Sequence, residues 1–130
     1  MILDQVENVI KQLSKDISCC ISVFAGRIAD TGRDPLPLMK QSLHMLKTRP
    51  KAELIWASPR QLFNIYDADA IGCHIITATA SILNKLSQIG YDLNRDATQS
   101  TSFSYGVKER IALYCPMLHK FLHDNFQKTV

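Results

Sequence analysis

The chain lacks the patterns that most often identify a cofactor site or a metal site. It has five glycines in 130 residues, and none of them forms a glycine-rich loop that cradles phosphates or a dinucleotide. Its four cysteines lack CxxC spacing, and the adjacent pair Cys19 and Cys20 would point to opposite faces of a strand. That pair cannot jointly hold a metal ion. We therefore expect no cofactor, no metal site, and reduced thiols, as in a cytoplasmic protein.

Long hydrophobic runs and clusters of one charge are also missing. No run approaches membrane-spanning length, and Asp4, Glu7 and Lys11 interrupt the apolar residues where a signal peptide would begin. The net charge of +3 comes from lysines and arginines scattered along the chain. We therefore expect neither nucleic acid nor a membrane as a partner. Apolar residues make up 46% of the sequence, as in an ordinary globular domain.

Apolar runs alternate with helical patterns over residues 1–93. We predict strands over residues 18–24, 52–57 and 72–77, and helices over 3–14, 35–47, a short stretch after Pro59, and 80–89. This alternation favours parallel βαβ units and an α/β fold. Residues 94–106 are polar and predict a loop, and residues 107–130 predict a tail that is helical over 107–126.

A strand that ends at a cation is the most informative local pattern. The apolar run from residue 18 is followed by Arg27, a polar turn, and a helix start at Asp34 and Pro35. Ser58 and Pro59 repeat the helix-start signal after the second strand. Parallel strands deliver such residues to the ligand-binding edge of a sheet. The order strand, cation, loop and helix is typical of an anion-binding α/β site.

Three blocks carry a resemblance to a known family. They are SVFAGRIADTGRDP at residues 22–35, AELIWASPR at 52–60 and IGCHIIT at 71–77. In this order and spacing they resemble the transaldolase family, and more closely its fructose-6-phosphate aldolase-like subfamily, over roughly residues 2 to 93. The resemblance implies a (β/α)8 TIM-type barrel in which a Schiff-base lysine supports aldol cleavage or transfer on sugar phosphates. On that plan, the chain is the C-terminal half of the barrel, with the last three parallel strands and their helices, plus the helical tail.

The resemblance also implies roles for four residues. Arg27 and Ser58 match the positions that bind the phosphate of the sugar, and Ser22 and Phe24 match positions in the substrate pocket. Phe24 stands where the subfamily has a tyrosine, so it brings no hydroxyl. The histidines carry weaker signals. His74 lies in an apolar strand and favours a hydrogen-bonded core histidine, and Cys115, His119 and His123 recur at helical spacing but favour a solvated face over a metal site.

The family's catalytic lysine, its acid and its water-orienting threonine would lie on earlier strands, upstream of Met1. We therefore expect a truncated half with no catalytic residue of its own, inactive alone. Alternation predicts Phe24 and Trp56 on an uncovered sheet face, with Ser22 and Ser58. That face calls for a complementary N-terminal half-barrel or self-association. The alternatives are a non-catalytic sugar-phosphate-binding or protein-interaction module, and a decaying gene fragment.

Overall fold

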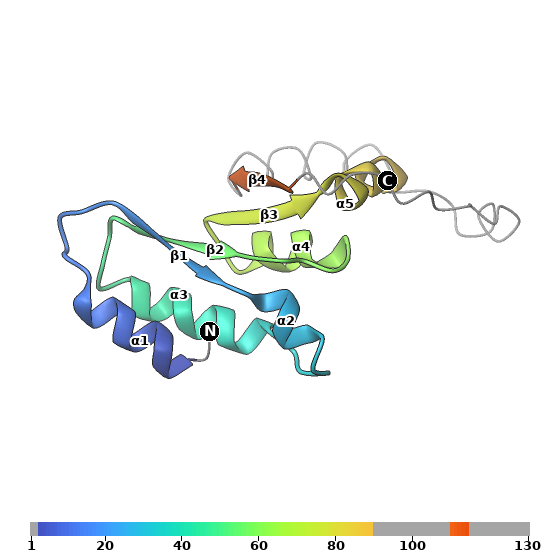
Figure 1. Ribbon diagram of the computed structural model, residues 1–130. Coiled ribbons are helices and arrows are strands. Elements are labelled where there is room, and N and C mark those ends of the chain that lie inside the picture. The colour runs from blue at the N-terminus through green and yellow to red at the C-terminus, as the bar shows by residue number, and fades with distance from the viewer. Residues whose placement is uncertain (1–2, 90–109, 115–130) are drawn as a thin grey trace, which may run out of the picture.

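The computed structural model describes residues 3–89 and the backbone of residues 110–114 (Figure 1). The elements are, in order, α1 (Leu3–Gln12), β1 (Cys19–Val23), α2 (Ala25–Ala29), α3 (Leu36–Leu46), β2 (Ala52–Trp56), α4 (Phe63–Ala70), β3 (Ile75–Thr79), α5 (Ala80–Asn84), the 3-10 helix η1 (Lys85–Gln88) and β4 (Arg110–Tyr114). The predicted loop over 94–106 and most of the predicted tail lie outside the described residues.

The strands form one sheet in the order β1-β2-β3-β4. β1, β2 and β3 are parallel, with Val23 opposite Trp56 and Ile55 opposite Ile75. The prediction of an α/β fold with three parallel strands and flanking helices is confirmed, and this arrangement is consistent with part of a (β/α)8 barrel. Parallel strands place all three carboxyl ends at one edge of the sheet, which is where Arg27 and Ser58 follow β1 and β2.

One face of the sheet carries the core. Alternate residues of the parallel strands are buried there, together with apolar residues from α1, α3, α4 and α5. Val6 and Met39 are fully buried, and α1 runs beside α3 beneath β1 and β2 in Figure 1. The opposite face, which we call the open face, consists of the alternate strand residues that are exposed or half-buried: Cys20, Ser22, Glu53, Ile55, Ile75, Thr77 and Thr79.

Trp56 lies on the core face, so its predicted place on the open face is wrong. The parallel register pairs Trp56 with Val23, and both are buried, with Trp56 only 1% exposed. The prediction extended the alternation backwards from Ser58, but the backbone of Ser58 departs from extended geometry with φ +58°. The indole N–H of Trp56 has no hydrogen-bond partner among the described residues.

β4 corrects the prediction of a helix over residues 107–126. Residues 110–114 form a strand that pairs antiparallel with β3, with Thr77 opposite Ala112. The sequence Arg-Ile-Ala-Leu-Tyr fits either element locally, because isoleucine and tyrosine favour strands as much as their spacing favours a helix. The outer edge of β3 offers unpaired N–H and C=O groups, and pairing with them decides the conformation.

The helix starts are partly as predicted. The carboxylate of Asp34 accepts a hydrogen bond from the Leu36 N–H at 2.9 Å, which confirms the start of α3 there. The predicted helix start at Ser58 and Pro59 is wrong, because α4 begins at Phe63. The side-chain oxygen of Asn64 instead accepts hydrogen bonds from the backbone N–H groups of Arg60 and Gln61. The short helix α2 replaces part of the predicted polar turn after β1.

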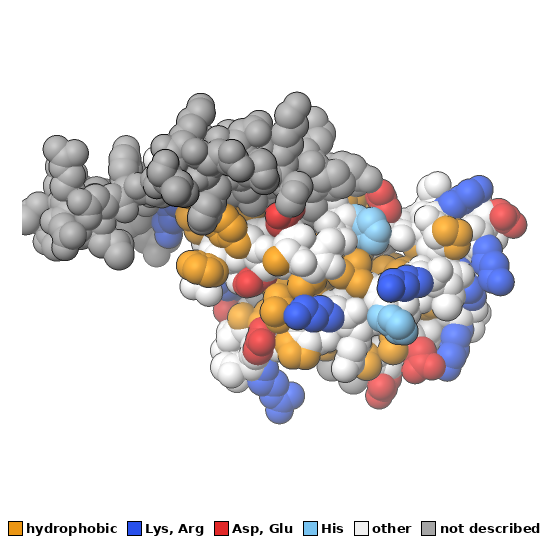
Figure 2. All heavy atoms as spheres, turned by 180° about the vertical axis from the view of Figure 1, so that it is seen from behind, with side chains coloured by type: hydrophobic (Ala, Val, Ile, Leu, Met, Phe, Trp, Pro, Cys, Tyr) orange, Lys and Arg blue, Asp and Glu red, His pale blue; other side chains and the backbone are white. Residues whose placement is uncertain are grey.

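None of the helices in the described part of the chain has the length and apolar character needed to cross a membrane. Figure 2 shows the molecule from behind, with lysine and arginine side chains interspersed among acidic and apolar ones. Among the side chains coloured on this face, no broad patch of one charge stands out.

Candidate anion site at the strand ends

Arg27 lies on α2, just beyond the end of β1, and its side chain is exposed. Its guanidinium carbon is 4.8 Å from the centre of the Phe24 ring, a cation–π contact that restricts the side chain. Within the described residues, the guanidinium forms no ion pair and donates no hydrogen bond. All five of its N–H donors are therefore available to an anion.

Asp30 is the acidic residue that could have neutralised Arg27, and it is bound elsewhere. Both carboxylate oxygens of Asp30 accept hydrogen bonds from Arg60, one of them from Nε at 3.0 Å. This bidentate ion pair raises the pKa of Arg60 through the hydrogen bond and the charge of Asp30. Asp30 follows α2 and Arg60 follows β2, so the pair connects the two loops of this edge and leaves Arg27 without an ion-pair partner among the described residues.

Ser58 stands at the carboxyl end of β2 in an unusual conformation. Its φ is +58°, in the left-handed region that residues with a Cβ rarely adopt. Its N–H donates to the hydroxyl of Thr77 on β3 at 3.2 Å, and its own hydroxyl has no hydrogen-bond partner among the described residues. Because Ser58 does not cap α4, this hydroxyl is available to a ligand.

The two predicted phosphate-binding residues lie on backbone segments that touch. A Cβ placed on Gly26 would lie 1.5 Å from the carbonyl oxygen of Ser58, so only glycine fits there. The Gly26 N–H donates to the carbonyl of Ala57 at 3.3 Å. The structure therefore brings the segments of Arg27 and Ser58 into contact, which sequence spacing could not show.

The predicted pocket residues are Ser22, near the end of β1, and Phe24, which directly follows that strand. Ser22 is half-buried on the open face, and Phe24, two residues further along, is 37% exposed beneath Arg27. Ser22 aligns with Ile55 of β2 in the parallel register. Phe24 therefore faces the candidate anion site as a supporting ring, and its apolar surface is partly open to solvent.

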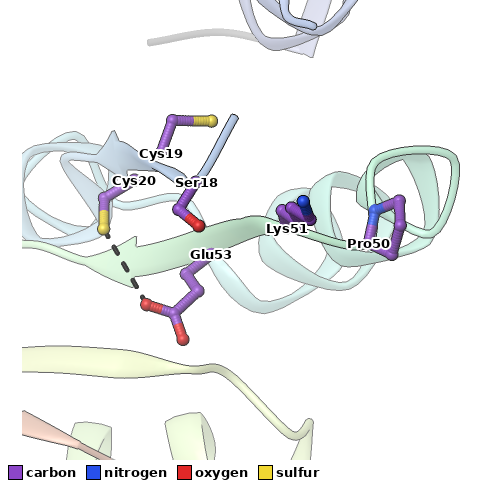
Figure 3. Close-up of a pocket in the computed structure, with 6 residues that line it drawn as sticks. All are labelled: Ser18, Cys19, Cys20, Pro50, Lys51 and Glu53. Atoms are coloured by element: carbon purple, nitrogen blue, oxygen red, sulfur yellow. Dashed lines mark hydrogen bonds between the residues drawn. The ribbon is translucent and has the colours of Figure 1, made fainter. Parts of the chain in front are cut away.

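A shallow hollow of about 350 Å³ lies at the other end of the sheet, near the amino ends of β1 and β2 (Figure 3). There the Cys20 thiol donates a weak hydrogen bond to Glu53, with sulfur and oxygen 3.9 Å apart. Partial desolvation, the charge of Glu53 and the neighbouring Cys19 raise the pKa of Cys20, so its thiol is a poor nucleophile at neutral pH.

The described residues give little support for a metal-binding or catalytic histidine. The predicted place of His74 inside a strand is wrong, because β3 begins at Ile75. As predicted, His74 is hydrogen-bonded: its Nδ1 accepts the N–H of Leu54 on β2 at 3.0 Å. Within residues 3–89, no group of three histidine, cysteine, aspartate or glutamate side chains could hold a metal ion. Cys115, His119 and His123 lie outside the described residues.

Comparison with known proteins shows the family to which this chain is similar. A family model described as transaldolase/fructose-6-phosphate aldolase matches residues 2–126. The chain belongs to this family. The match continues well past residue 93, so the resemblance extends further along the chain than the sequence blocks indicated. The region that carries β4 is included in it.

A curated transaldolase relative gives a more limited match. The chain is 31% identical over 70 residues to a probable transaldolase from Nitrosopumilus maritimus (strain SCM1). These residues make up 52% of this chain and 32% of the relative, so the matched part spans about a third of that protein's length.

Three features of the candidate anion site were missed from the sequence: the close contact of Gly26, the pairing of Asp30 with Arg60, and the hydroxyl of Thr77. The glycine directly before Arg27 was a usable signal, because a glycine after a buried strand often marks a close backbone approach. The other two depend on contacts between residues about 20 to 30 positions apart.

Proposed function

We propose that this chain forms the phosphate-binding end of a transaldolase-type site, with Arg27 and Ser58 as the groups that bind a sugar phosphate. The observation that carries this proposal is the unpaired guanidinium of Arg27, held on Phe24, next to a serine whose hydroxyl is also unpaired among the described residues. A planar guanidinium matches a phosphate with two parallel hydrogen bonds. Binding the phosphate would fix the rest of the sugar relative to reacting groups.

The aldol chemistry itself needs groups beyond these residues. A Schiff-base lysine requires a desolvated position that depresses its pKa. None of the strands that the structure describes carries a lysine, and Lys51, just before β2, donates to the carbonyl of Asp16 at the opposite end of the sheet. We therefore propose that this chain by itself binds sugar phosphate without forming a Schiff base.

A complete site then requires a complementary segment, in the same polypeptide or a separate chain. β1 is an edge strand in the described sheet, and β4 occupies the outer edge of β3. A closed barrel gives every strand two neighbours, so a complementary set of strands would pair with β1 and replace β4 beside β3. The open face, with Ser22, Ile55 and Thr77, would become the barrel interior.

The test is a phosphorus NMR titration of fructose 6-phosphate with the wild-type chain, Arg27→Ala and Lys47→Ala. Arg27→Ala is expected to weaken binding by about tenfold or more, because hydrogen bonds to a charged group contribute about 1.5–3 kcal/mol. Lys47→Ala removes one positive charge at the other end of the sheet, beside the start of β2, and should leave binding nearly unchanged. Equal losses in both variants, or no binding by the wild type, would contradict the proposal.

The second candidate is a non-catalytic module that binds sugar phosphate as its end function, which the lysine-free strands favour. Borohydride reduction with fructose 6-phosphate separates the two. A trapped adduct only when a complementary half is added supports the split enzyme, whereas binding without an adduct in either case supports the module.

A further inference from the structure

We propose that Thr77 is a positioning residue of this site, whose hydroxyl holds the left-handed turn at Ser58 so that Ser58 and Arg27 bind the same phosphate. This inference rests on the proposed function and adds a residue on the third strand to a site so far built from two. Thr77 would act through Ser58 rather than by touching the ligand.

The conformation of Ser58 needs support from its surroundings. A φ of +58° is strained for a residue with a Cβ, and such strain persists only where neighbouring contacts hold it in place. Neither the next helix nor a glycine explains the turn, because α4 begins at Phe63 and the residue is a serine. The contacts that hold it must therefore come from the adjacent strands.

Two contacts hold the Ser58 peptide from opposite sides. On the β3 side, the hydroxyl of Thr77 accepts the Ser58 N–H at 3.2 Å. On the β1 side, Gly26 packs directly against the Ser58 carbonyl. The preceding residue is fixed as well, because the Ala57 N–H donates to the Val23 carbonyl at 2.8 Å. The turn is therefore clamped between β1 and β3.

The Thr77 contact replaces a backbone hydrogen bond. The parallel pairing of β2 and β3 joins only residues 55 and 56 of β2 to β3, so it ends before Ser58. A threonine hydroxyl on the open face of β3 then provides the acceptor that a strand carbonyl would otherwise supply. Without it, the Ser58 N–H loses its partner and the turn can relax to an extended conformation, which would move the serine hydroxyl from its present position.

The experiment compares Thr77→Val, Thr77→Ser and Thr79→Val with the wild type. Valine keeps the shape of threonine but has no acceptor, and serine keeps the acceptor. Thr79 is a matched control on the same strand face, where its hydroxyl contacts Ser81 at 2.8 Å. Two quantities are measured: the affinity for fructose 6-phosphate by phosphorus NMR, and the exchange rate of the Ser58 amide hydrogen without ligand. Trp56, the single tryptophan, reports folding by its fluorescence.

Thr77→Val should weaken binding about three- to tenfold, the range for one lost hydrogen bond, and accelerate exchange of the Ser58 amide. Thr77→Ser should restore both values, and Thr79→Val should change neither. If Thr77→Val does not fold, Thr77→Ala replaces it. Unchanged affinity and exchange in a folded Thr77 variant would overturn this inference and leave the proposed function intact. Absence of binding by the wild type would overturn the proposed function, and the exchange rate would then still decide whether Thr77 holds the turn.

Discussion

The backbone contact between Gly26 and Ser58 sets the distance between the carboxyl ends of β1 and β2. The site of an added Cβ on Gly26 is occupied by a backbone carbonyl, which cannot rotate away as a side chain can. The proposed phosphate-binding arginine follows directly in sequence, so its position depends on this contact. The contact therefore connects local packing to the proposed function.

Gly26→Ala should destabilise the protein by about 3 kcal/mol, near the upper end for overpacking, because the backbone must shift to admit the methyl group. Gly32→Ala is the control. Gly32 has φ +76° and open space around it, so only backbone strain of about 1–2 kcal/mol applies. Urea unfolding followed by Trp56 fluorescence measures both values. A smaller loss for Gly26→Ala than for Gly32→Ala would contradict the close packing.

Cys20 provides a prediction of pH dependence at the other end of the sheet. Its pKa is raised by partial desolvation and then by Glu53, so the neutral thiol is favoured. Glu53→Gln removes the negative charge and should lower this pKa. A unit charge about 4 Å away contributes about 1 kcal/mol in water, so alkylation of Cys20 below its pKa should accelerate about two- to fivefold.

Alkylation rates at several pH values, resolved by peptide mapping in a Cys19→Ser background, measure this effect. Glu7→Gln, on α1 and paired with Lys11, is the charge-matched control and should leave the rate unchanged. Slower alkylation in Glu53→Gln would contradict the assigned cause.

At the scale of elements, the sequence was informative where local patterns decide structure. The parallel strands and the helices α1 and α3 follow from apolar periodicity and the signal at Asp34. The exceptions are elements decided by distant partners. β4 forms on the edge of β3. Ser58 does not cap a helix as predicted, because Thr77 and Gly26 hold its backbone in another conformation. Arg27 was placed correctly at the strand end, but its freedom depends on the distant Arg60 occupying Asp30.

The antiparallel pairing of β4 can be tested by cross-linking. Thr79 lies opposite Arg110 in the register, and opposed Cα atoms in such pairs are about 4.5–5.5 Å apart, within disulfide range. Thr79→Cys with Arg110→Cys should therefore oxidise to a disulfide. Thr79→Cys with Ala112→Cys, two residues out of register, should not. Non-reducing peptide mapping identifies the product, and equal cross-linking of both pairs would argue against the register.

At the scale of the whole molecule, the sheet has one face that helices cover and one open face. Helices cover one side of the sheet, and the open face carries half-buried residues next to the proposed phosphate site. Membership of the transaldolase/fructose-6-phosphate aldolase family is shown by the match over residues 2–126. We propose that Arg27 and Ser58 bind the phosphate, and that the aldol chemistry depends on a complementary segment.

The most direct test of this account is a backbone NMR titration of the wild-type chain with fructose 6-phosphate and, separately, with fructose. We expect fructose 6-phosphate to shift the amide signals of Gly26, Arg27 and Ser58 and fructose to leave them in place, because the phosphate supplies the binding energy. This expectation would be contradicted if both sugars shifted the same amides equally, or if the shifts gathered at Cys20 and Glu53 at the opposite end of the sheet.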